Sequence, residues 1–311
     1  MRLLFAGTPE PAVPALQRLL ASRHDVVAVL TRPDAPVGRG RRLARSEVAR
    51  VADEAGIPVL QPSGLRDPAA LTTIRDLKVD ACPIVAYGNL IPSPLLSALP
   101  HGWINLHFSL LPAWRGAAPV QHAIWHGDDL TGATTFLLDE GMDTGPVFGT
   151  VTEPVHPRDT AGDLLARLAV SGAELLAVTL DAVESGDVVA VPQGDDGASL
   201  APKITSEDAR VAWQQPSLAV DRQIRAFTPA PGAWTTLRDI RVKIAPVLPV
   251  PGHEDLDAVP GQLRESGRNT WLVATGSGAV QLTDVQPAGK RSMPAADWLR
   301  GLRPGAGETF R

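Results

Sequence analysis

The sequence predicts an α/β fold, with a doubly wound, mostly parallel sheet followed by a smaller domain of short strands. The first observation is a strand, helix, strand order at the start of the chain, where the apolar runs Leu3–Ala6 and Asp25–Leu30 flank a helical segment. The second is that further apolar runs alternate with helical patterns as far as Glu184. The third is a series of short strand-like runs after residue 205, with turn residues between them, which is typical of a small β-barrel.

Each element of the larger domain follows from its own residues. After the turn at Gly7, Thr8 is placed to cap a helix from about Pro9 to Ser22. The remaining helices are predicted at Glu47–Gly56, Pro68–Leu77, Ser93–Leu99, Ala117–His126 and Thr160–Glu184. The remaining strands are predicted at Pro58–Leu60, Asp80–Tyr87, Gly102–His107, Thr131–Leu138 and Val147–Val155.

Composition divides the chain into three parts. Residues 1–185 are predicted to form the α/β domain, and residues 186–204, rich in Gly, Asp, Pro and Ser, a linker. Residues 205–311 are predicted to form the β-rich domain, with one helix at Ser217–Phe227. Its strands are predicted at Trp234–Leu237, Val242–Ala245, Gly261–Leu263, Thr270–Thr275 and Ala279–Val285.

Charge and composition narrow the function classes. The 44% of hydrophobic and 20% of charged residues are those of an ordinary globular protein. The net charge of −5 argues against binding a polyanion over the whole surface. Residues 205–311 carry 13 Lys and Arg against 11 Asp and Glu, a net charge of +2, whereas residues 1–204 carry −7. An anionic partner is therefore expected to meet the β-rich domain.

Cys82 is the only cysteine of the chain, so a disulfide within the chain is excluded and a reducing compartment is expected. No segment approaches the roughly 20 apolar residues that a membrane span needs. The first apolar run is also too short for a signal peptide. We therefore expect a cytoplasmic protein with no membrane partner.

The segment Trp103–Pro112 carries the strongest functional signal. Its first half is an apolar strand, yet it contains Asn105 and His107, which strand alternation places on the same side. Both come near the carboxyl end of the strand, the end at which ligands bind in open α/β sheets. A core histidine with a satisfied partner is the alternative reading of His107.

A long polar loop, Thr31–Arg45, follows the second strand. It holds Arg32, Arg39, Arg41, Arg42 and Arg45 against a single acidic residue. A connection of this length is unusual in an α/β unit. Its guanidinium groups suit phosphate contacts, although a solvated basic loop is an equal alternative.

Asp143, in the Gly-rich segment Asp139–Gly145, is the third candidate residue. A carboxylate beside an imidazole favours a proton near neutral pH, and an amide supplies a fixed N–H donor. This combination suits a reaction in which negative charge builds up on a carbonyl oxygen. Since no serine or cysteine is placed as a nucleophile, we expect the nucleophile to belong to the substrate, as in direct acyl transfer.

Other chemistries are disfavoured by what the motifs lack. The triplet Asp143-Thr144-Gly145 also occurs in aspartic proteases, but these need two such carboxylates and the chain has one copy. His122 and His126 have the spacing of zinc ligands, yet Ala123 stands where the glutamate would be, so no metal is expected. The first turn lacks the G-x-G-x-x-G pattern of nicotinamide cofactor sites.

The motifs closely resemble the 10-formyltetrahydrofolate-dependent formyltransferases. Those of the N-terminal two-thirds are Ala6-Gly7-Thr8-Pro9, Asn105-x-His107-x-Ser109-Leu110-Leu111-Pro112, Arg115-Gly116-Ala117-Ala118-Pro119 and Asp139-x-Gly141-x-Asp143-Thr144-Gly145. Three more are similar to the members of this family that act on methionyl-tRNA and extend the resemblance to nearly the whole chain. They are Pro33-Asp34-x-Pro36-x-Gly38-Arg39-Gly40, Arg225-Ala226-Phe227-x-Pro229-x-Pro231-Gly232 and Gln286-Pro287-Ala288-Gly289-Lys290.

The resemblance implies a Rossmann-like catalytic domain and a C-terminal OB-like β-barrel that helps to hold tRNA. It implies formyl transfer from 10-formyltetrahydrofolate to the α-amino group of methionyl initiator tRNA, for translation initiation, by a monomer. Asn105, His107 and Asp143 match the catalytic trio, in which a protonated His107 and Asn105 hold the oxyanion and Asp143 handles the proton. The implied folate contacts are Ser109, Leu110, Leu111, Pro112, Tyr87 and Gly141, and the implied tRNA contacts are Arg39, Arg41, Arg42 and Lys203.

Two alternatives remain open at this point. One is a formyltransferase for a small amine, such as glycinamide ribonucleotide or an amino-sugar nucleotide; the Arg-rich loop and the second domain argue against it. The other is a non-catalytic tRNA-binding relic.

Two departures from the family pattern bear on the folate pocket: Phe108 stands where many members have glycine, and Pro83 interrupts an apolar strand.

Overall fold

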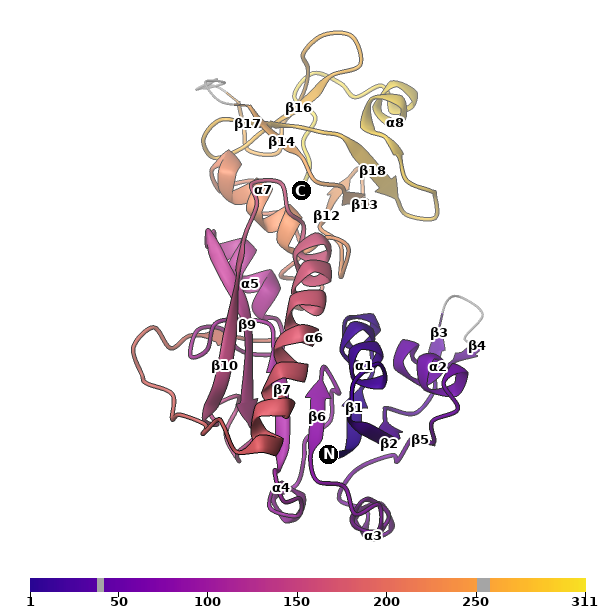
Figure 1. Ribbon diagram of the computed structural model, residues 1–311. Helices are drawn as coiled ribbons and strands as arrows, with labels where there is room; N and C mark the ends of the chain where they lie inside the picture. The colour runs from indigo at the N-terminus through magenta and orange to yellow at the C-terminus, as the bar shows by residue number, and fades with distance from the viewer. Residues whose placement is uncertain (38–41, 251–257) are drawn as a thin grey trace. The chain divides into compact units, whose positions relative to one another are not determined.

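The computed structural model describes residues 1–37, 42–250 and 258–311, which form two compact units (Figure 1). The first unit comprises Met1–Pro119, Leu130–Pro154 and Leu165–Ala201. The second comprises Val120–Asp129, Val155–Leu164 and Pro202–Arg311. Within the described ranges, no helix combines the length and the apolar character that crossing a bilayer would require.

The first unit is built on a mixed sheet with the strand order β10-β9-β7-β6-β1-β2-β5. Five strands are parallel, and β9 and β10 are antiparallel, so the expected mostly parallel sheet is confirmed. The strands are β1 (Arg2–Gly7), β2 (Asp25–Leu30), β5 (Val59–Leu60), β6 (Cys82–Val85), β7 (Trp103–His107), β9 (Leu130–Leu137) and β10 (Val147–Pro154).

The helices lie close to their predicted places. They are α1 (Val13–Leu20), preceded by a 3-10 turn at Glu10–Ala12, α2 (Glu47–Glu54), α3 (Pro68–Asp76), α4 (Ser93–Leu96), α5 (Pro119–His126) and α6 (Ala161–Ser185). The prediction that Thr8 caps the first helix was wrong. Its hydroxyl donates to the carbonyl of Tyr87 at 2.9 Å and so ties the end of β1 to the segment after β6.

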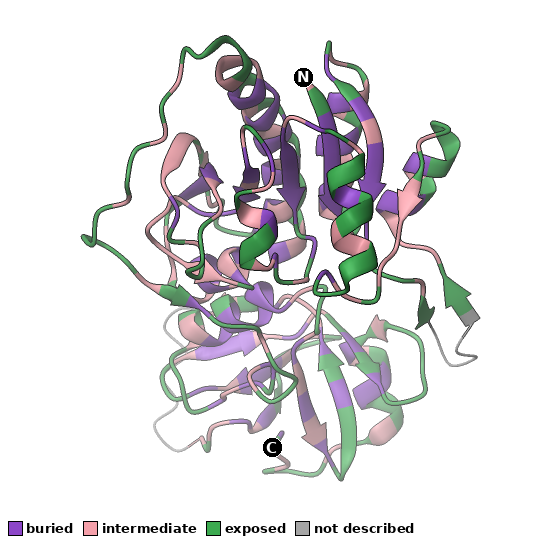
Figure 2. Cartoon of the chain, turned by 90° about the horizontal axis from the view of Figure 1, so that it is seen from below, coloured by how far each residue is buried: buried purple, intermediate pink, exposed green. Residues whose placement is uncertain are grey.

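The core of the first unit lies on the faces of this sheet, where the central strands are buried (Figure 2). α6 packs along β7, β9 and β10: the hydroxyls of Thr135 and Thr179 are 2.9 Å apart, and Gly172 lies against Leu106. Pro83 lies inside β6, which stays paired with strands on both sides, so this residue does not displace the strand. Phe108 is buried directly after β7.

Two segments predicted to lack regular structure contain short strands. The Arg-rich loop includes an antiparallel hairpin, β3 (Ala35–Val37) and β4 (Arg42–Ala44). In the predicted linker, β11 (Leu200–Ala201) pairs in parallel with β8 (Arg115–Gly116). The segment after α6 is therefore part of the first unit rather than a free connection.

The second unit contains two antiparallel four-stranded sheets, and no closed barrel is found among its described residues. The strand orders are β12-β13-β18-β19 and β14-β17-β16-β15. The strands are β12 (Trp234–Leu237), β13 (Ile240–Ile244), β14 (Leu248–Val250), β15 (Leu263–Glu265), β16 (Trp271–Ala274), β17 (Ala279–Gln281), β18 (Asp284–Pro287) and β19 (Met293–Pro294). The helices are α7 (Ser217–Ala226) and α8 (Ala295–Leu302).

The predicted strand Ala279–Val285 is in fact divided between the two sheets, as β17 and β18. Trp213 and Phe310 stack in the core of this unit, with ring centroids 5.6 Å apart. On the helical side, Trp125 meets the ring of Phe227 edge-on at 4.9 Å. The motif that begins at Arg225 is therefore a packing motif within the second unit.

Candidate active site

Strand β7 holds Asn105 and His107 on one side at the carboxyl end of the parallel strands. It lies between β6 and β9, pairing Asn105 with Ile84 and Phe136 and pairing His107 with Thr134. The other strand residues are buried and fix the strand in the sheet. The Asn105 side chain is half-buried, and within the described residues its amide makes no hydrogen bond. It is therefore available to a ligand.

His107 and Asp143 are brought together by the fold although they are distant in the chain. The Nδ1 atom of His107 lies 3.7 Å from Oδ2 of Asp143. On the other side of the ring, Nε2 lies 2.8 Å from the carbonyl oxygen of Trp114. Because a carbonyl only accepts, Nε2 must carry a hydrogen, and Nδ1 is left to exchange a proton with Asp143.

The protonation of His107 differs from the expectation. Burial lowers the pKa of His107 from its usual value of 6.5, although the Asp143 carboxylate and the bond to Trp114 act in the opposite direction. The imidazole is therefore neutral near pH 7 in the free protein, and the expected protonated ring is not what this environment favours. The desolvation of a ring with only 7% of its side chain exposed outweighs one nearby carboxylate.

Asp143 is held in a loop that its own polar groups organise. Its backbone has φ of 54°, the left-handed region that non-glycine residues rarely adopt. Oδ2 accepts a hydrogen bond from the backbone N–H of Gly116 at 2.8 Å. Earlier in the loop, Asp139 accepts from the backbone N–H of Gly141 and from the hydroxyl of Thr144. The carboxylate of Asp143 is thus directed at His107.

The segment Ser109–Pro112 is a tightly bonded turn beside β9. Ser109 is fully buried; its hydroxyl donates to the carbonyl of Ala113 at 2.6 Å, and its own carbonyl accepts from the Thr134 hydroxyl. The same Thr134 oxygen accepts from the N–H of Leu111. The polar groups of Ser109 are therefore used within the protein, while Leu110, Leu111 and Pro112 remain partly exposed.

The other two expected folate residues differ in exposure. Tyr87 is only 2% exposed and packs in the core, where burial raises the pKa of its phenol. Its hydroxyl lies 3.5 Å from the Asn89 amide. Gly141 is exposed in the same loop as Asp143.

A cavity of about 520 Å³ adjoins this loop, and none of the residues that line it was among the expected folate contacts. It is lined by Arg66, Leu71, Leu90, Ile91, Pro92, Ser93, Pro94, Leu96, Asp139 and Glu140. Most of the lining follows the carboxyl end of β6, and Leu90 is 73% exposed. The apolar and proline-rich segment that follows the carboxyl end of a buried parallel strand is the signal that could have revealed it.

Comparison with known proteins identifies the family of the chain. The family described as formyl transferase matches residues 1–180, and the formyl transferase C-terminal domain matches residues 203–303. The chain belongs to the formyl transferase family.

Curated relatives extend the similarity over the whole chain. The methionyl-tRNA formyltransferase of Thermobifida fusca (strain YX) is 60% identical over 310 residues, which are 100% of this chain and 99% of the relative. That of Streptomyces coelicolor is 60% identical over 309 residues, which are 99% of each chain.

Two solved structures share the fold at low sequence identity. The N-formyltransferase from Helicobacter canadensis, solved with folinic acid and dTDP-3-aminofucose, has a TM-score of 0.68 and 18% identity, covering 92% of this chain and 98% of its own. HypX from Aquifex aeolicus, in complex with tetrahydrofolic acid, has a TM-score of 0.63 and 20% identity, covering 98% of this chain and 48% of its own. At these identities the likeness is evidence of the fold alone.

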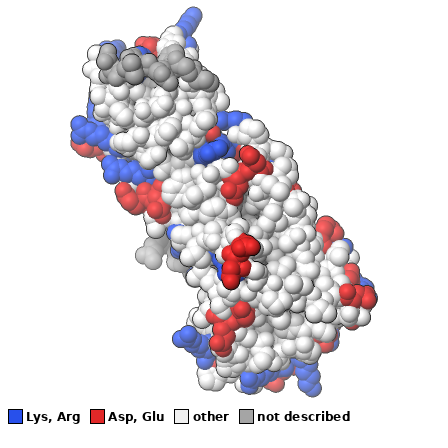
Figure 3. Space-filling view, turned by 90° about the vertical axis from the view of Figure 1, so that its left-hand side faces the viewer, with Lys and Arg blue, Asp and Glu red and all other residues white. Residues whose placement is uncertain are grey.

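The residues expected to contact tRNA are placed only in part. Arg39 and Arg41 lie outside the described residues, and Arg42 is the first residue of β4. Lys203 is exposed in the second unit. On the face drawn in Figure 3, basic and acidic side chains form small neighbouring groups of both signs.

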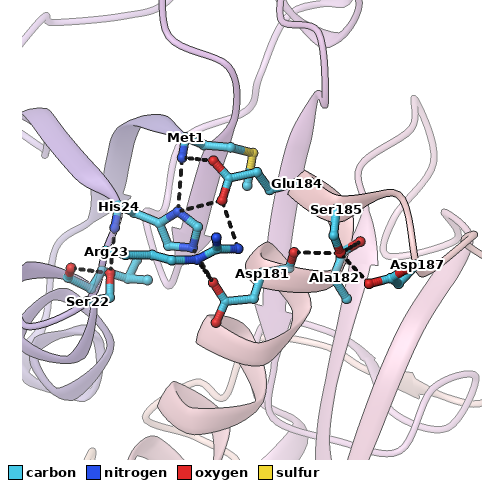
Figure 4. A network of polar contacts seen from close by, with 10 residues as sticks. Met1, Ser22, Arg23, His24, Asp181, Ala182, Glu184, Ser185 and Asp187 are labelled. Atoms are coloured by element: carbon cyan, nitrogen blue, oxygen red, sulfur yellow. Dashed lines mark hydrogen bonds and ion pairs between the residues drawn. The ribbon is translucent and has the colours of Figure 1, made fainter.

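A second histidine–carboxylate cluster lies at the opposite, amino edge of the sheet (Figure 4). His24 Nε2 is 3.3 Å from Asp181, and Nδ1 is 3.2 Å from the amino group of Met1. Arg23 pairs with both Asp181 and Glu184. Although ligand atoms of His24, Asp181 and Glu184 lie within 4.8 Å of one another, these carboxylates already have cationic partners. We read the cluster, here called the amino-edge cluster, as an ion-pair network that ties α6 to β1.

Proposed function

We propose that this formyl transferase family member transfers the formyl group of 10-formyltetrahydrofolate to the α-amino group of methionyl initiator tRNA. The products are N-formylmethionyl-tRNA and tetrahydrofolate, for translation initiation. The observation that carries the proposal is the convergence of His107 and Asp143, beside the available amide of Asn105, next to a cavity at the carboxyl edge of the sheet. Full-length relatives named methionyl-tRNA formyltransferase support the choice of acceptor.

The chemistry we propose is direct attack of the amine on the formyl carbon. An α-amino group has a pKa near 8, so a useful fraction is neutral at physiological pH. The Asn105 amide donates to the developing oxyanion, and the Nε2–H of His107, which donates to Trp114 without substrate, is the second donor. Asp143 takes the proton that the amine loses, through His107 Nδ1 or a water, and returns it to N10 of the leaving folate.

We place the pterin of the folate in the cavity beside the Asp143 loop. Its apolar wall, which includes Ile91 and Leu96, suits a flat ring, and the carboxylates of Asp139 and Glu140 can accept from the ring's N–H groups. Leu110, Leu111 and Pro112 are proposed to contact the same co-substrate near the reacting carbon. Gly141, which has no side chain, would allow the folate to approach the backbone closely. Ser109 and Tyr87 shape the site from within the core.

For the tRNA, we propose a division of labour between the two parts of the chain. Residues 1–185 carry out catalysis, and residues 205–311, with a net charge of +2 and two antiparallel sheets that we propose form an OB-like fold, hold the RNA. Arg39, Arg41, Arg42 and Lys203 are proposed to contact the acceptor end. We also propose that the protein acts as a monomer in the cytoplasm.

One assay decides between this function and its alternatives. Charged initiator tRNA and 10-formyltetrahydrofolate are supplied with glycinamide ribonucleotide and an amino-sugar nucleotide as competing acceptors. The proposal expects formyl-methionyl-tRNA as the main product. Preferential formylation of a small amine would overturn the choice of acceptor, and tRNA binding without any transfer would leave only a tRNA-binding relic.

A double substitution tests the Arg-rich segment separately. Replacing Arg41 and Arg42 by alanine should raise KM for the tRNA about tenfold or more at physiological salt and flatten its salt dependence, because each phosphate contact releases counterions. KM for the folate should stay unchanged. An equal loss for both substrates would show that the segment is structural.

A further inference from the structure

Gln193, in the segment after α6, contacts the loop that carries Asp143. Its Nε2 atom donates to the carbonyl oxygens of Asp143 at 2.9 Å and of Gly145 at 2.8 Å. Its Oε1 atom accepts from Nε and Nη2 of Arg115, at 3.1 and 2.7 Å. Both amide hydrogens and the amide oxygen are therefore used, which fixes the orientation of this side chain.

Arg115 and Gly116 approach Asp143 from two directions. The backbone N–H of Gly116 donates to the Asp143 carboxylate, and the Arg115 side chain reaches the Asp143 carbonyl through Gln193. Gly116 has φ of 127°, and a Cβ there would lie 2.6 Å from the carbonyl oxygen of Ala201. The glycine is thus required for the N–H to point at the carboxylate. Together, Gly116 and the Arg115–Gln193 pair hold Asp143 at both its carboxylate and its backbone carbonyl.

The segment that supplies Gln193 is itself attached at both ends, and Figure 1 shows it returning beside β10 after α6. The backbones of Val191 and Val147 exchange two hydrogen bonds of 2.8 Å. Further along, Ser199 accepts from the backbone N–H groups of Trp114 and Arg115, through its hydroxyl and its carbonyl, both at 2.9 Å. Gln193 is therefore presented from a fixed backbone.

The Asp143 loop needs such support for a physical reason. A left-handed backbone is unfavourable at aspartate and persists only where surrounding contacts determine it. The bond from Gln193 acts on the carbonyl of that residue, whereas the bond from Gly116 acts on its carboxylate. Without the first bond, the loop can relax and the carboxylate can turn away from His107.

We propose that Gln193, supported by Arg115, is a positioning residue for formyl transfer that keeps the Asp143 carboxylate facing His107. It acts through Asp143 and has no contact with the reacting atoms. The inference rests on the proposed function as far as turnover is concerned. The orientation of Asp143 toward His107 can be tested by measurements that need no enzymatic turnover.

The first test is the titration of His107, followed by NMR of its ring protons in the free protein. Gln193→Glu keeps the size of the side chain and still accepts from Arg115, but it cannot donate to the two carbonyls. The Asp143 charge raises the pKa of His107, so turning Asp143 away should lower this pKa, as removal of the charge in Asp143→Asn should also do. Gln193→Ala, which places no charge near the loop, should shift it in the same direction.

Gln223 in the second unit offers a matched control. Its Nε2 also donates to two backbone carbonyls, those of Asp208 and Arg210, both at 2.9 Å, and its Oε1 accepts from the N–H of Ala212. Gln223→Glu breaks the same kinds of bond and, because Gln223 is more buried than Gln193, should lower Tm at least as much. This substitution should leave the titration of His107 unchanged, because Gln223 is not among the residues that hydrogen-bond to Asp143.

The second test is turnover with saturating substrates. Gln193→Glu should lower kcat by about 10–100-fold, the cost of misplacing a reacting group by about 1 Å. Arg115→Lys, which keeps a donor for Oε1, should cause a smaller loss. A folded Gln193→Ala protein with the wild-type His107 titration would overturn the proposal, whatever its kcat. If the wild-type protein transfers no formyl groups but the titration shifts in the variants as expected, the positioning stands and the proposed function fails.

Discussion

The first unit contains two histidine–carboxylate pairs at opposite edges of one sheet. His107 is the last residue of β7, at the carboxyl edge, and its ring lies 3.7 Å from Asp143. His24 directly precedes β2, at the amino edge, and its ring lies 3.3 Å from Asp181. In both cases burial is the main cause that lowers the pKa of the histidine.

The two pairs differ in the partners of their carboxylates. In the amino-edge cluster, Arg23 lowers the pKa of Asp181, and the amino group of Met1 lowers that of Glu184. Asp143 instead accepts from a neutral backbone N–H, and within the described residues it forms no ion pair with Lys or Arg. A carboxylate saturated with cations is a poor proton acceptor, so the same residue types are structural at one edge and suited to proton transfer at the other.

The largest expected effect separates the two carboxylates by activity. Asp143→Asn should lower kcat by at least about 100-fold, because a general acid–base group contributes about 10²–10⁴. Asp181→Asn should leave kcat within about twofold of wild type and cost little stability, as expected for an exposed ion pair. Steady-state formylation of charged initiator tRNA measures both. Equal losses of kcat in the two variants, or no loss in either, would show that the two carboxylates do not differ in function.

Asn105→Ala tests the oxyanion donor and should lower kcat by about 10²–10³. The Asn105 side chain is half-buried, and its amide makes no hydrogen bond within the described residues, so its removal should leave Tm nearly unchanged. Thermal unfolding monitored alongside turnover provides the control. Near-wild-type turnover in the folded variant would exclude Asn105 from the chemistry.

The two imidazoles should respond differently to loss of their nearest carboxylate. His107 should titrate below pH 6.5 and, in Asp143→Asn, at a still lower pH, because Asp143 is the charged group that raises its pKa. His24 should shift less in Asp181→Asn, since Glu184 remains beside it. NMR titration of both rings gives the comparison. A larger shift at His24 would contradict it.

The smallest expected effect concerns stability against pH. Because the pKa of buried His24 lies below its unfolded value of 6.5, the unfolded chain binds more protons as the pH falls. The unfolding free energy should therefore decrease below about pH 6.5. His24→Gln should reduce this decrease between pH 7 and pH 5 in urea unfolding. An unchanged pH dependence would show that His24 does not contribute.

Local pattern was sufficient to predict much of the site. Strand alternation placed Asn105 and His107 together, and the Gly-rich loop indicated Asp143. Gln193 could not be predicted, because its role depends on contacts across about fifty residues from a segment whose composition indicated a linker. The same distance in sequence hid the cavity between the Asp143 loop and the segment after β6.

Three of the missed strands, β3, β14 and β19, share one cause. β14 and β19 each contain a proline, Pro249 and Pro294, which argues against a central strand. Both strands lie at the edges of their sheets, where a missing N–H donor is tolerated. The hairpin in the Arg-rich loop contains Pro36 and was missed for the same reason. These prolines are tolerated because their strands lie at sheet edges, and the position of a strand in its sheet cannot be predicted from the local sequence pattern.

The most direct test of this mechanism is a crystal structure of the protein with a stable analogue of 10-formyltetrahydrofolate that carries its formyl group at the N10 position. We expect the pterin in the cavity beside Asp139 and the formyl oxygen within about 3.5 Å of the Asn105 amide, with His107 and Asp143 next to the same formyl group. A formyl group bound away from these three side chains would contradict it.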